Sequence, residues 1–426
     1  MTKLQSTRNS AADGPTTDGR ASEFGRAYRP FEHDPSFSLF ARARVEAPVF
    51  WCDEIGYWVV TRREDIAPIF QDPDTFGAEI ALSPVADLAP EAITVMRDGG
   101  FDSVPVQVNC NPPTHSRVRE IAGTYLNAKQ YRTLEPYIHA KTVAFLDAME
   151  GKGQVDLVAD LAYDLPALVI FQMMGIPDAD VNRIKRWANN RLLLTFGQLT
   201  TGEQMACARD MVAYWDYCRE LVAARLVEPQ DDYPSALLRE RNGDDDVLTI
   251  KEIESLVFGL LLAGHETTTN QTGNAFRMLL SHPEAWQAIC DDPKLIPNAI
   301  EETLRFQASV VCWRRRTKRA VTIGGVEIPA GANLLLATAS ASRDESNFAD
   351  GERFDIHRRN AREHLAFGSG IHFCIGAPLA RLELRVILEE ATKRFPNMRL
   401  VDDQEIEMVR TIAFRGPTKL LVELGA

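Results

Sequence analysis

The spacing of apolar and polar residues divides the chain into a long helical part and a few short strands. Pro48–Trp51 and Tyr57–Val60 cluster aromatic and β-branched residues, which predicts two strands. Val321–Ile328 predicts a hairpin, because β-branched triplets flank two consecutive glycines. Met408–Phe414 and Leu420–Leu424 predict a closing pair of strands. Nearly everything else has helical spacing, so we expect a mainly α fold with small β-sheets.

One predicted helix combines an apolar first half with a polar middle. It begins at Thr249 with a capping-box sequence, and apolar residues recur at helical spacing as far as Leu261. Continued to Leu280, it would contain roughly thirty residues and measure about 45 Å. Its middle, Ala263–Asn270, is rich in poor helix formers. Either the helix emerges into solvent there, or it opens locally, with threonine hydroxyls bonding backbone carbonyls and a carboxylate facing a cavity.

Composition and charge fit a soluble globular protein. The 426 residues are 45% hydrophobic and 25% charged, and the net charge of −13 argues against general binding to nucleic acid or anionic membranes. Residues 1–26 are polar and lack a signal peptide's apolar core, so we expect a flexible tail before one domain spanning 27–426. Glu228–Val247 is acidic and contains proline, which predicts a surface loop between helices. The longest apolar stretches, Leu165–Ile176 and Leu256–Gly264, are shorter than the about 20 residues of a membrane span, so we expect a cytoplasmic protein.

The cysteines point to one candidate site. There are seven, with no C-x-x-C pair, which fits free thiols in a reducing compartment and predicts no zinc site or iron–sulfur cluster. Cys374 lies in the glycine-rich stretch Phe367–Gly376, just before an amphipathic helix beginning near Ala377. A lone buried cysteine is usually only a small apolar residue. Here the glycines allow close approach of a flat group, and the helix N-terminus should lower the thiol's pKa, as an axial haem thiolate requires.

At this point the sequence resembles the cytochrome P450 family. Phe367–Gly376 matches the family pattern F-x-x-G-x-H-x-C-x-G at every defined position, and other family motifs follow in order between about Asn111 and Glu383. The resemblance implies a P450-like fold and haem b (iron protoporphyrin IX), with Cys374 as the axial thiolate and metal ligand. The other cofactor contacts that it implies are Phe367, Gly368, Gly376, His372, Ala263, His115, Arg119 and Arg315.

Two further motifs resemble those of the family: one is a pair of oppositely charged residues, and the other is an acid–alcohol pair that could deliver protons. Glu302-Thr-Leu-Arg305 matches E-x-x-R, whose side chains share one helix face. Alone it could be a surface ion pair, but the resemblance implies a buried structural pair that braces the haem-binding side. Ala263–Thr267 resembles the family's acid–alcohol element, with Glu266 where many members have Asp. Glu266 and Thr267 are therefore the predicted catalytic residues: the hydroxyl holds oxygen and a water, and the carboxylate connects the site to bulk solvent.

The haem propionates would require cationic partners. The run from Asn111 to Arg119 resembles D-P-P-x-H-x-x-x-R, with His115 and Arg119 on one helix face and Asn111 in place of Asp. Arg315 aligns with the family's strand arginine, although arginines on both sides leave the assignment open by one residue. With His372, the motifs supply four possible cations. Any one of them alone could be a solvated cation.

The substrate pocket is implied only by resemblance. Regions 79–108 and 189–204 would close over it. The apolar run Leu192–Leu194, followed by Phe196, favours an apolar ligand, although a helix packed on its neighbour gives the same stripe. We expect a small-to-medium hydrophobic or aromatic substrate. The implied substrate contacts are Leu262, Ala263, Thr267, Val311, Trp313 and Phe414.

Electrons are expected from other proteins. The chain contains no G-x-G-x-x-G motif and no cysteine cluster for a plant-type iron–sulfur centre. We expect a ferredoxin or flavodoxin-like carrier with its NAD(P)H reductase, acting on a monomer. His357–Arg362, with Arg117, Arg381 and Arg385, could form a basic docking patch for an acidic carrier. A merely solvated face explains these charges equally well.

The resemblance implies a haem-thiolate monooxygenase that inserts one atom of O2 by hydroxylation, epoxidation or O-dealkylation. One alternative keeps the haem but is peroxide-driven or non-hydroxylating, and the Glu266–Thr267 pair argues against peroxide use. A second alternative is a non-enzymatic haem sensor or electron carrier. A third is a metal-free helical binding module with chance motif matches.

Overall fold

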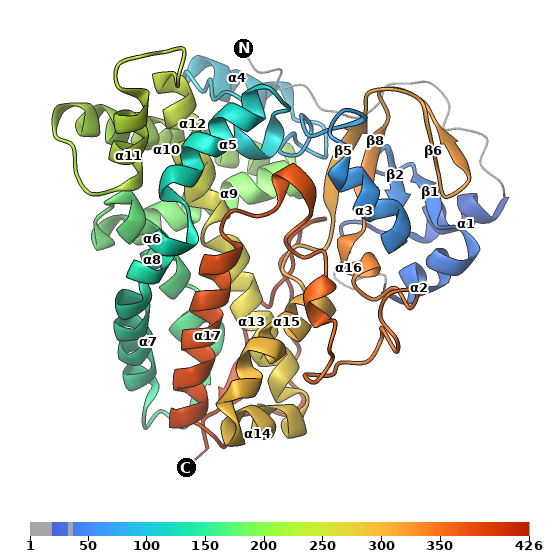
Figure 1. The fold of residues 1–426 in the computed structure, drawn as a ribbon, viewed down its shortest axis with the longest axis vertical. Helices are drawn as coiled ribbons and strands as arrows, with labels where there is room; N and C mark the ends of the chain where they lie inside the picture. The colour runs from blue at the N-terminus through green and yellow to red at the C-terminus, as the bar shows by residue number, and fades with distance from the viewer. Residues whose placement is uncertain (1–18, 33–36, 426) are drawn as a thin grey trace.

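The computed structural model describes residues 19–32 and 37–425, and helices predominate in this part of the chain (Figure 1). Those of the first half are α1 (Gly19–Ala27), α2 (Phe37–Glu46), α3 (Arg63–Gln71), α4 (Pro90–Asp98), α5 (Thr114–Tyr125), α6 (Ala128–Thr133), α7 (Glu135–Met149), α8 (Leu165–Met174), α9 (Val181–Phe196) and α10 (Thr201–Val227). Those of the second half are α11 (Tyr233–Arg241), α12 (Ile250–Ala263), α13 (Glu266–Leu280), α14 (Pro283–Asp291), α15 (Ile296–Phe306), α16 (Thr338–Ala341) and α17 (Ala377–Arg394). Among these described helices, none combines the length and apolar character needed to cross a membrane.

The strands form three small sheets. The largest has the order β1 (Val49–Cys52), β2 (Tyr57–Val60), β8 (Asn333–Leu336), β5 (Trp313–Thr317), β3 (Phe76–Gly77). The second is β4 (Gln154–Asp156), β10 (Leu421–Glu423), β9 (Arg399–Leu400), and the third is the hairpin β6 (Val321–Ile323) with β7 (Val326–Ile328). Among the strands of the described residues, only β2 and β8 pair in parallel. Figure 1 shows the large sheet beside α1–α3 on one side of the molecule, with most helices on the other.

Short helical turns complete the chain. They are η1 (Gln107–Asn109), η2 (Val158–Ala162), η3 (Asp178–Asp180), η4 (Pro293–Leu295), η5 (Ala361–Glu363) and η6 (Gly370–His372). All are 3₁₀ turns except η2, which is a π-helix. The last of them, η6, leads directly into the segment that carries the candidate cysteine and then into α17.

Local sequence signals located several elements correctly. Strand β2 and the β6–β7 hairpin have the predicted bounds, and β1 is shifted by one residue from its prediction. The predicted closing pair is wrong. Residues 408–414 form only the isolated bridges Met408–Pro417 and Val310–Phe414, while β10 pairs with β4 and β9. The partners of β10 come from distant parts of the chain, which no local pattern reveals.

Two segments predicted to be irregular contain helices. The expected loop at 228–247 includes α11, which the Asp232 side chain caps by accepting the Ser235 N–H at 2.9 Å. This helix buries Tyr233 and Leu237 inside an acidic stretch, so composition concealed its apolar face. Within the expected tail, Gly19–Ala27 forms α1, whose Phe24 is 1% exposed and packs against Phe50. The remainder of that expected tail, residues 1–18, lies outside the described residues.

The long helix is interrupted as its polar middle suggested. Helix α12 ends at Ala263 and α13 begins at Glu266. The capping box is present, with Thr249 and Glu252 bonding each other's backbone N–H groups. His265 is 0% and Glu266 8% exposed, so the helix opens inside the core and does not emerge into solvent. Thr267 Oγ1 donates to the Ala263 carbonyl at 3.0 Å, the expected hydroxyl–carbonyl bond.

Candidate active site

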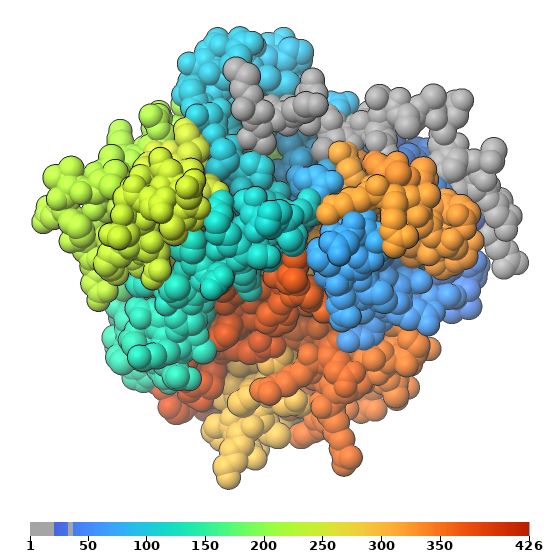
Figure 2. Space-filling view, turned by 45° about the horizontal axis from the view of Figure 1, so that its top comes forward, coloured from blue at the N-terminus to red at the C-terminus, as the bar shows by residue number. Residues whose placement is uncertain are grey.

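Cys374 lies between η6 and α17, in a loop fixed by backbone contacts. Its N–H donates to the Phe367 carbonyl at 3.0 Å. Gly368 and Gly370 both have φ of +69°, and a Cβ on Gly370 would lie 2.2 Å from the Phe70 carbonyl oxygen. Glycine is therefore required where the loop packs on α3. Figure 2 shows this orange-red segment reaching the surface between blue α3 and teal α5–α6.

The thiol environment differs from expectation in one respect. Burial raises the pKa of Cys374, and the backbone N–H groups of Gly376 and Ala377 with Arg119 offset that effect only in part. The predicted lowering of the pKa by the start of α17 is therefore wrong for the protein alone, because desolvation outweighs the helix terminus. The side chain is nevertheless accessible, which leaves the sulfur able to meet a ligand.

A second group of residues supplies polar atoms near the loop. The rings of His115 and His372 lie 4.1 Å apart, centroid to centroid. Within the described part of the chain, His115 Nε2, His372 Nε2 and Arg315 Nη2 are buried atoms without a hydrogen-bond partner. Unpaired buried polar atoms are costly, so three together indicate a polar group that they bind. Arg119 Nη2 donates to the Phe373 carbonyl at 2.6 Å, which ties α5 to the same loop.

Two of the four predicted cations are neutral. Burial and the charge of Arg315 lower the pKa of His372 to about 3. Burial, with the nearby Arg119 and Arg315, also lowers the pKa of His115. At neutral pH both rings are therefore hydrogen-bonding groups and carry no charge, which corrects the expectation. Burial lowers the pKa of Arg315 to about 10, so it stays charged.

The structure distinguishes Arg315 from its neighbours. Arg314 donates to the carbonyls of Ser83 at 2.7 Å and Ala81 at 2.8 Å. Arg316 Nε donates to Asn333 Oδ1 at 3.1 Å. Of the three, Arg315 is the one that interacts electrostatically with both histidines. This favours Arg315, and not a neighbouring arginine, as the predicted propionate contact.

Asn111, the departure from the family pattern, has a specific local role. Its Oδ1 accepts the Ala78 N–H at 2.9 Å, and its Nδ2 donates to Glu79 Oε2 at 3.0 Å. An aspartate could accept the first bond but not donate the second, and it would repel Glu79. Asparagine therefore fits this chain better than the family's usual residue.

The acid–alcohol pair is more enclosed than expected. His265 Nε2 lies 3.1 Å from Glu266 Oε1. Burial alone would raise the pKa of Glu266, but His265 and then Lys185 outweigh it and lower the pKa, so the carboxylate is ionised at neutral pH. Only 8% of Glu266 is exposed, so its connection to bulk solvent, which stays a prediction, would have to pass through other groups. Lys185, fully buried on α9, has no distinguishing sequence signal and was missed.

The face of the interrupted helix that carries Thr267 is open. Ala263 is exposed and Gly259 and Thr267 are half-buried, although His265 and Glu266 between them are buried. A Cβ added to Gly259 would meet nothing within 4 Å. Residues at this spacing of four share one side of a helix, so one side of α12–α13 has free space beside it.

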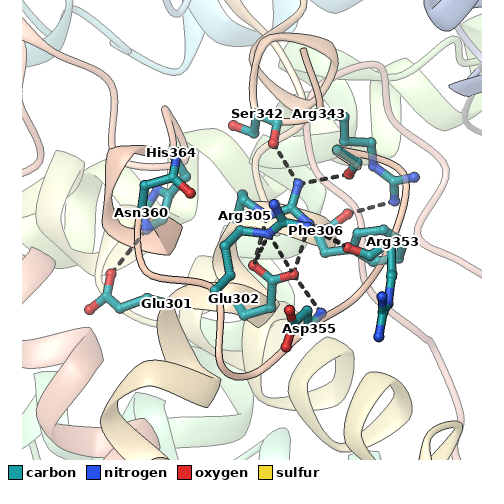
Figure 3. Close-up of polar contacts among 12 residues, drawn as sticks. Glu301, Glu302, Arg305, Phe306, Ser342, Arg343, Arg353, Asp355, Asn360 and His364 are labelled. Carbon is teal, nitrogen blue, oxygen red and sulfur yellow. Dashed lines mark hydrogen bonds and ion pairs between the residues drawn. The ribbon is translucent and has the colours of Figure 1, made fainter. Parts of the chain in front are cut away.

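Glu302 and Arg305 form a buried pair, not a surface one. Both side chains are 0% exposed, and the guanidinium meets the carboxylate through two bonds of 2.7 and 2.8 Å. Arg305 also donates to the carbonyls of Ser342 and Arg353, as Figure 3 shows, and to that of Gly351. Arg358, which the sequence placed in a docking patch, is buried and lies 3.4 Å from Glu302. A run of adjacent arginines gives no local sign of which one is buried.

The two aromatic predicted substrate contacts, Trp313 and Phe414, each pack against Phe196. Phe196 is 5.0 Å from Phe414 and 6.2 Å from Trp313, centroid to centroid. The Val311 N–H donates to the Ala413 carbonyl at 2.8 Å, which joins the strand entry to the C-terminal loop. The Leu192–Leu194 run contributes mainly to the core, since its first and last members are 0% and 6% exposed. This supports helix packing as the origin of that stripe.

Most arginines of the expected docking patch have carboxylate partners inside the protein. Three are engaged as follows: Arg117 with Glu252, Arg381 with Glu301, and Arg385 with Glu135 and Glu389. The exposed basic residues in the run before the cysteine loop are His357, Arg359 and Arg362, and of these Arg362 Nε also lies 3.7 Å from Glu301 Oε1. The patch is therefore smaller than the sequence predicted.

These residues fit a haem. An exposed cysteine at the start of a helix could supply an axial ligand, and the charged Arg315 with the orphaned ring nitrogens of His115 and His372 forms a polar site for propionates. Glycines bring the loop backbone close to the ligand, and the opened helix leaves space on its Thr267 side.

Comparison with known proteins gives a consistent result. A family model described as Cytochrome P450 matches residues 290–411. Cytochrome P450 107B1 of Saccharopolyspora erythraea is 38% identical over 379 residues, which cover 87% of this chain and 89% of the relative. Mycinamicin IV hydroxylase/epoxidase of Micromonospora griseorubida is 35% identical over 369 residues, covering 86% and 89%. The solved structure of cytochrome P450 CREJ in complex with (4-ethylphenyl) dihydrogen phosphate superposes with a TM-score of 0.91 at 41% identity, covering 94% of this chain and 99% of that one.

Proposed function

The chain belongs to the cytochrome P450 family, and from that premise we propose that it oxygenates a small-to-medium hydrophobic or aromatic substrate with electrons from separate carrier proteins. It is a P450 monooxygenase that binds protohaem through an axial cysteine thiolate. The haem supplies reductive activation of O2 and transfer of one oxygen atom to substrate by hydroxylation, epoxidation or O-dealkylation. Cys374 is the proposed ligand. The observation that carries this assignment is an exposed cysteine two residues after His372, which is one of three residues with orphaned buried polar atoms.

Proton delivery is assigned to the interruption between α12 and α13. The Thr267 hydroxyl donates a hydrogen bond to the Ala263 carbonyl, so the lone pairs of its oxygen can accept a hydrogen bond from a water. Glu266 is ionised and adjacent, so it can take up a proton and pass it to that water. The presence of this pair favours O2 over peroxide as the oxidant.

Thr267→Ala should separate reductant use from product formation. Without the hydroxyl, protons arrive in an undirected way, so reductant is still consumed while product falls roughly tenfold or more and hydrogen peroxide rises. Peroxide, product and NAD(P)H are measured in the same reaction. Thr269→Ala is the matched control, because Thr269 is a buried threonine on α13 two residues away, off the open helix face. Unchanged coupling in Thr267→Ala would exclude this proton role.

The half-buried Trp313, which packs against Phe196, supports an aromatic substrate. The solved relative that holds (4-ethylphenyl) dihydrogen phosphate suggests the first probe. We expect that compound or its phosphate-free analogue, 4-ethylphenol, to shift the spin state of the ferric protein and to be oxygenated. A shift with the phosphate alone would identify an anion-binding pocket. No shift with either would contradict the aromatic proposal.

Docking of the electron carrier is assigned to the exposed residues His357, Arg359 and Arg362. Because electrostatic attraction mainly sets association rates, the double variant Arg359→Glu/Arg362→Gln, which places no new carboxylate beside Glu301, should slow electron transfer from an acidic ferredoxin roughly tenfold at low salt. The difference should shrink as salt rises, because added ions screen exposed charges. Arg219→Glu on α10, also exposed but on a different part of the molecule, is the control. Stopped-flow reduction that is insensitive to salt and to both arginines would refute this surface.

A further inference from the structure

Glu301 and Glu302 are adjacent on α15 but serve different parts of the molecule. Glu302 points to Arg305, whereas Glu301 points toward His364, as Figure 3 shows. Glu301 is only 1% exposed. Burial alone would raise its pKa, but hydrogen bonds from His364 and Arg381 outweigh that and lower the pKa to about 2. A fully charged carboxylate is therefore fixed just beneath the cysteine loop, and the mechanism above does not use it.

The first group that Glu301 holds is the guanidinium of Arg381, on the first turns of α17. Nε donates to Oε1 at 2.7 Å and Nη2 donates to Oε2 at 3.0 Å. Two parallel charge-assisted bonds fix the plane of the guanidinium as well as its position. That plane lies over the ring of Phe367, with Cζ 4.6 Å from the ring centroid.

The second group is His364, whose tautomer the structure fixes. The Ala366 N–H donates to Nδ1 at 3.1 Å, so Nδ1 carries no proton. Nε2, which carries it, lies 3.2 Å from Glu301 Oε2 and can donate. Burial lowers the pKa of His364, so the ring is neutral. This tether holds residues 364–366 against α15, and the His364 ring lies 5.7 Å from the Phe367 ring.

Phe367 connects this network to the cysteine. Its ring is held by Arg381 on one side and borders His364, while its carbonyl accepts the Cys374 N–H at 3.0 Å. A shift of Phe367 therefore moves the backbone that carries the thiol. We propose that Glu301 and Arg381 are positioning residues for the axial thiolate: together they hold Phe367, and through its carbonyl the Cys374 backbone, in the orientation that the iron ligand needs. This inference rests on the proposed role of Cys374.

The test compares Glu301→Gln and Arg381→Lys in the haem-loaded protein. Gln keeps the size but not the charge, and Lys keeps the charge but not the planar, bidentate contact. In both variants we expect the red-shifted Soret band of the reduced carbon monoxide complex to decay roughly tenfold faster than in the wild type, and the iron reduction potential to shift. Arg385→Lys is the matched control. It is one turn further along α17, is 32% exposed against 31% for Arg381, and forms carboxylate pairs that do not touch the loop.

The double variant separates a shared action from two independent ones. If the two residues act as a unit, Glu301→Gln/Arg381→Lys decays no faster than the worse single variant. Additive effects, or a decay and potential matching Arg385→Lys, would overturn the proposal. If Glu301→Gln does not fold, the same comparison of single and double variants is made with Arg381→Lys and Phe367→Leu, because both residues are less buried than Glu301. Absence of the red-shifted band in the wild type would instead contradict the assignment of Cys374.

Discussion

Replacement of Cys374 by serine should abolish the red-shifted Soret band of the reduced carbon monoxide complex and reduce oxygenation to background. The reason is chemical. A serine hydroxyl does not ionise near neutral pH and is a harder donor than sulfur, so it cannot provide the electron donation that favours O–O cleavage. The structure gives the substitution little other consequence, because serine preserves the N–H bond to Phe367 and the glycine turns around it.

The spectrum distinguishes loss of the ligand from loss of the fold. The propionate-binding atoms of His115, His372 and Arg315 are untouched, so we expect Cys374→Ser to retain some haem with an unshifted carbon monoxide band. Cys290→Ser is the control, since Cys290 is a partly buried free cysteine whose sulfur lies near the Pro396 carbonyl, away from the loop. A red-shifted band that survives in Cys374→Ser, or that disappears in Cys290→Ser, would assign the ligand elsewhere.

Local chemistry explains which features could be predicted from the sequence. The Thr249 capping box, the β6–β7 hairpin and the opening near Gly264 each depend on residues within a few positions of one another. The cysteine loop has the same character, because its glycines are needed where they stand: Gly370 packs on the Phe70 carbonyl. In such segments the residues that form the sequence pattern also make the structural contacts, so the pattern predicts the structure.

The features that were missed depend on contacts between distant segments. Nothing in the run His357–Arg362 distinguishes Arg358, which becomes the second cation on Glu302, from the exposed Arg359 beside it. Glu301 differs from Glu302 only in the direction it faces from α15. Burial also changes the charge of side chains. The sequence predicted that His115 and His372 are cations, but desolvation and the nearby Arg315 lower their pKa, so both are neutral.

The buried charge cluster should be the most sensitive structural element outside the cysteine loop. Glu302 is 0% exposed, and its carboxylate faces Arg305 and Arg358 while accepting the Asp355 N–H at 2.8 Å. Glu302→Gln keeps the shape but removes the negative charge that faces Arg305 and Arg358, leaving two buried guanidinium groups facing a neutral amide. Removing one partner of a buried ion pair typically costs about 3–5 kcal/mol, a large share of the roughly 5–15 kcal/mol that stabilises a protein.

We therefore expect Glu302→Gln to lower the free energy of unfolding by about 3–5 kcal/mol and to reduce haem retention, because Arg305 also holds the chain at Ser342, Gly351 and Arg353. Urea unfolding followed by circular dichroism, with and without haem, measures both effects. Glu352→Gln is the matched control: Glu352 also bridges two arginines, Arg44 and Arg343, but its side chain is 39% exposed. Water can replace the charge there, so the loss should be about 1 kcal/mol. Equal losses in the two variants would mean that burial is not what makes the Glu302 cluster essential.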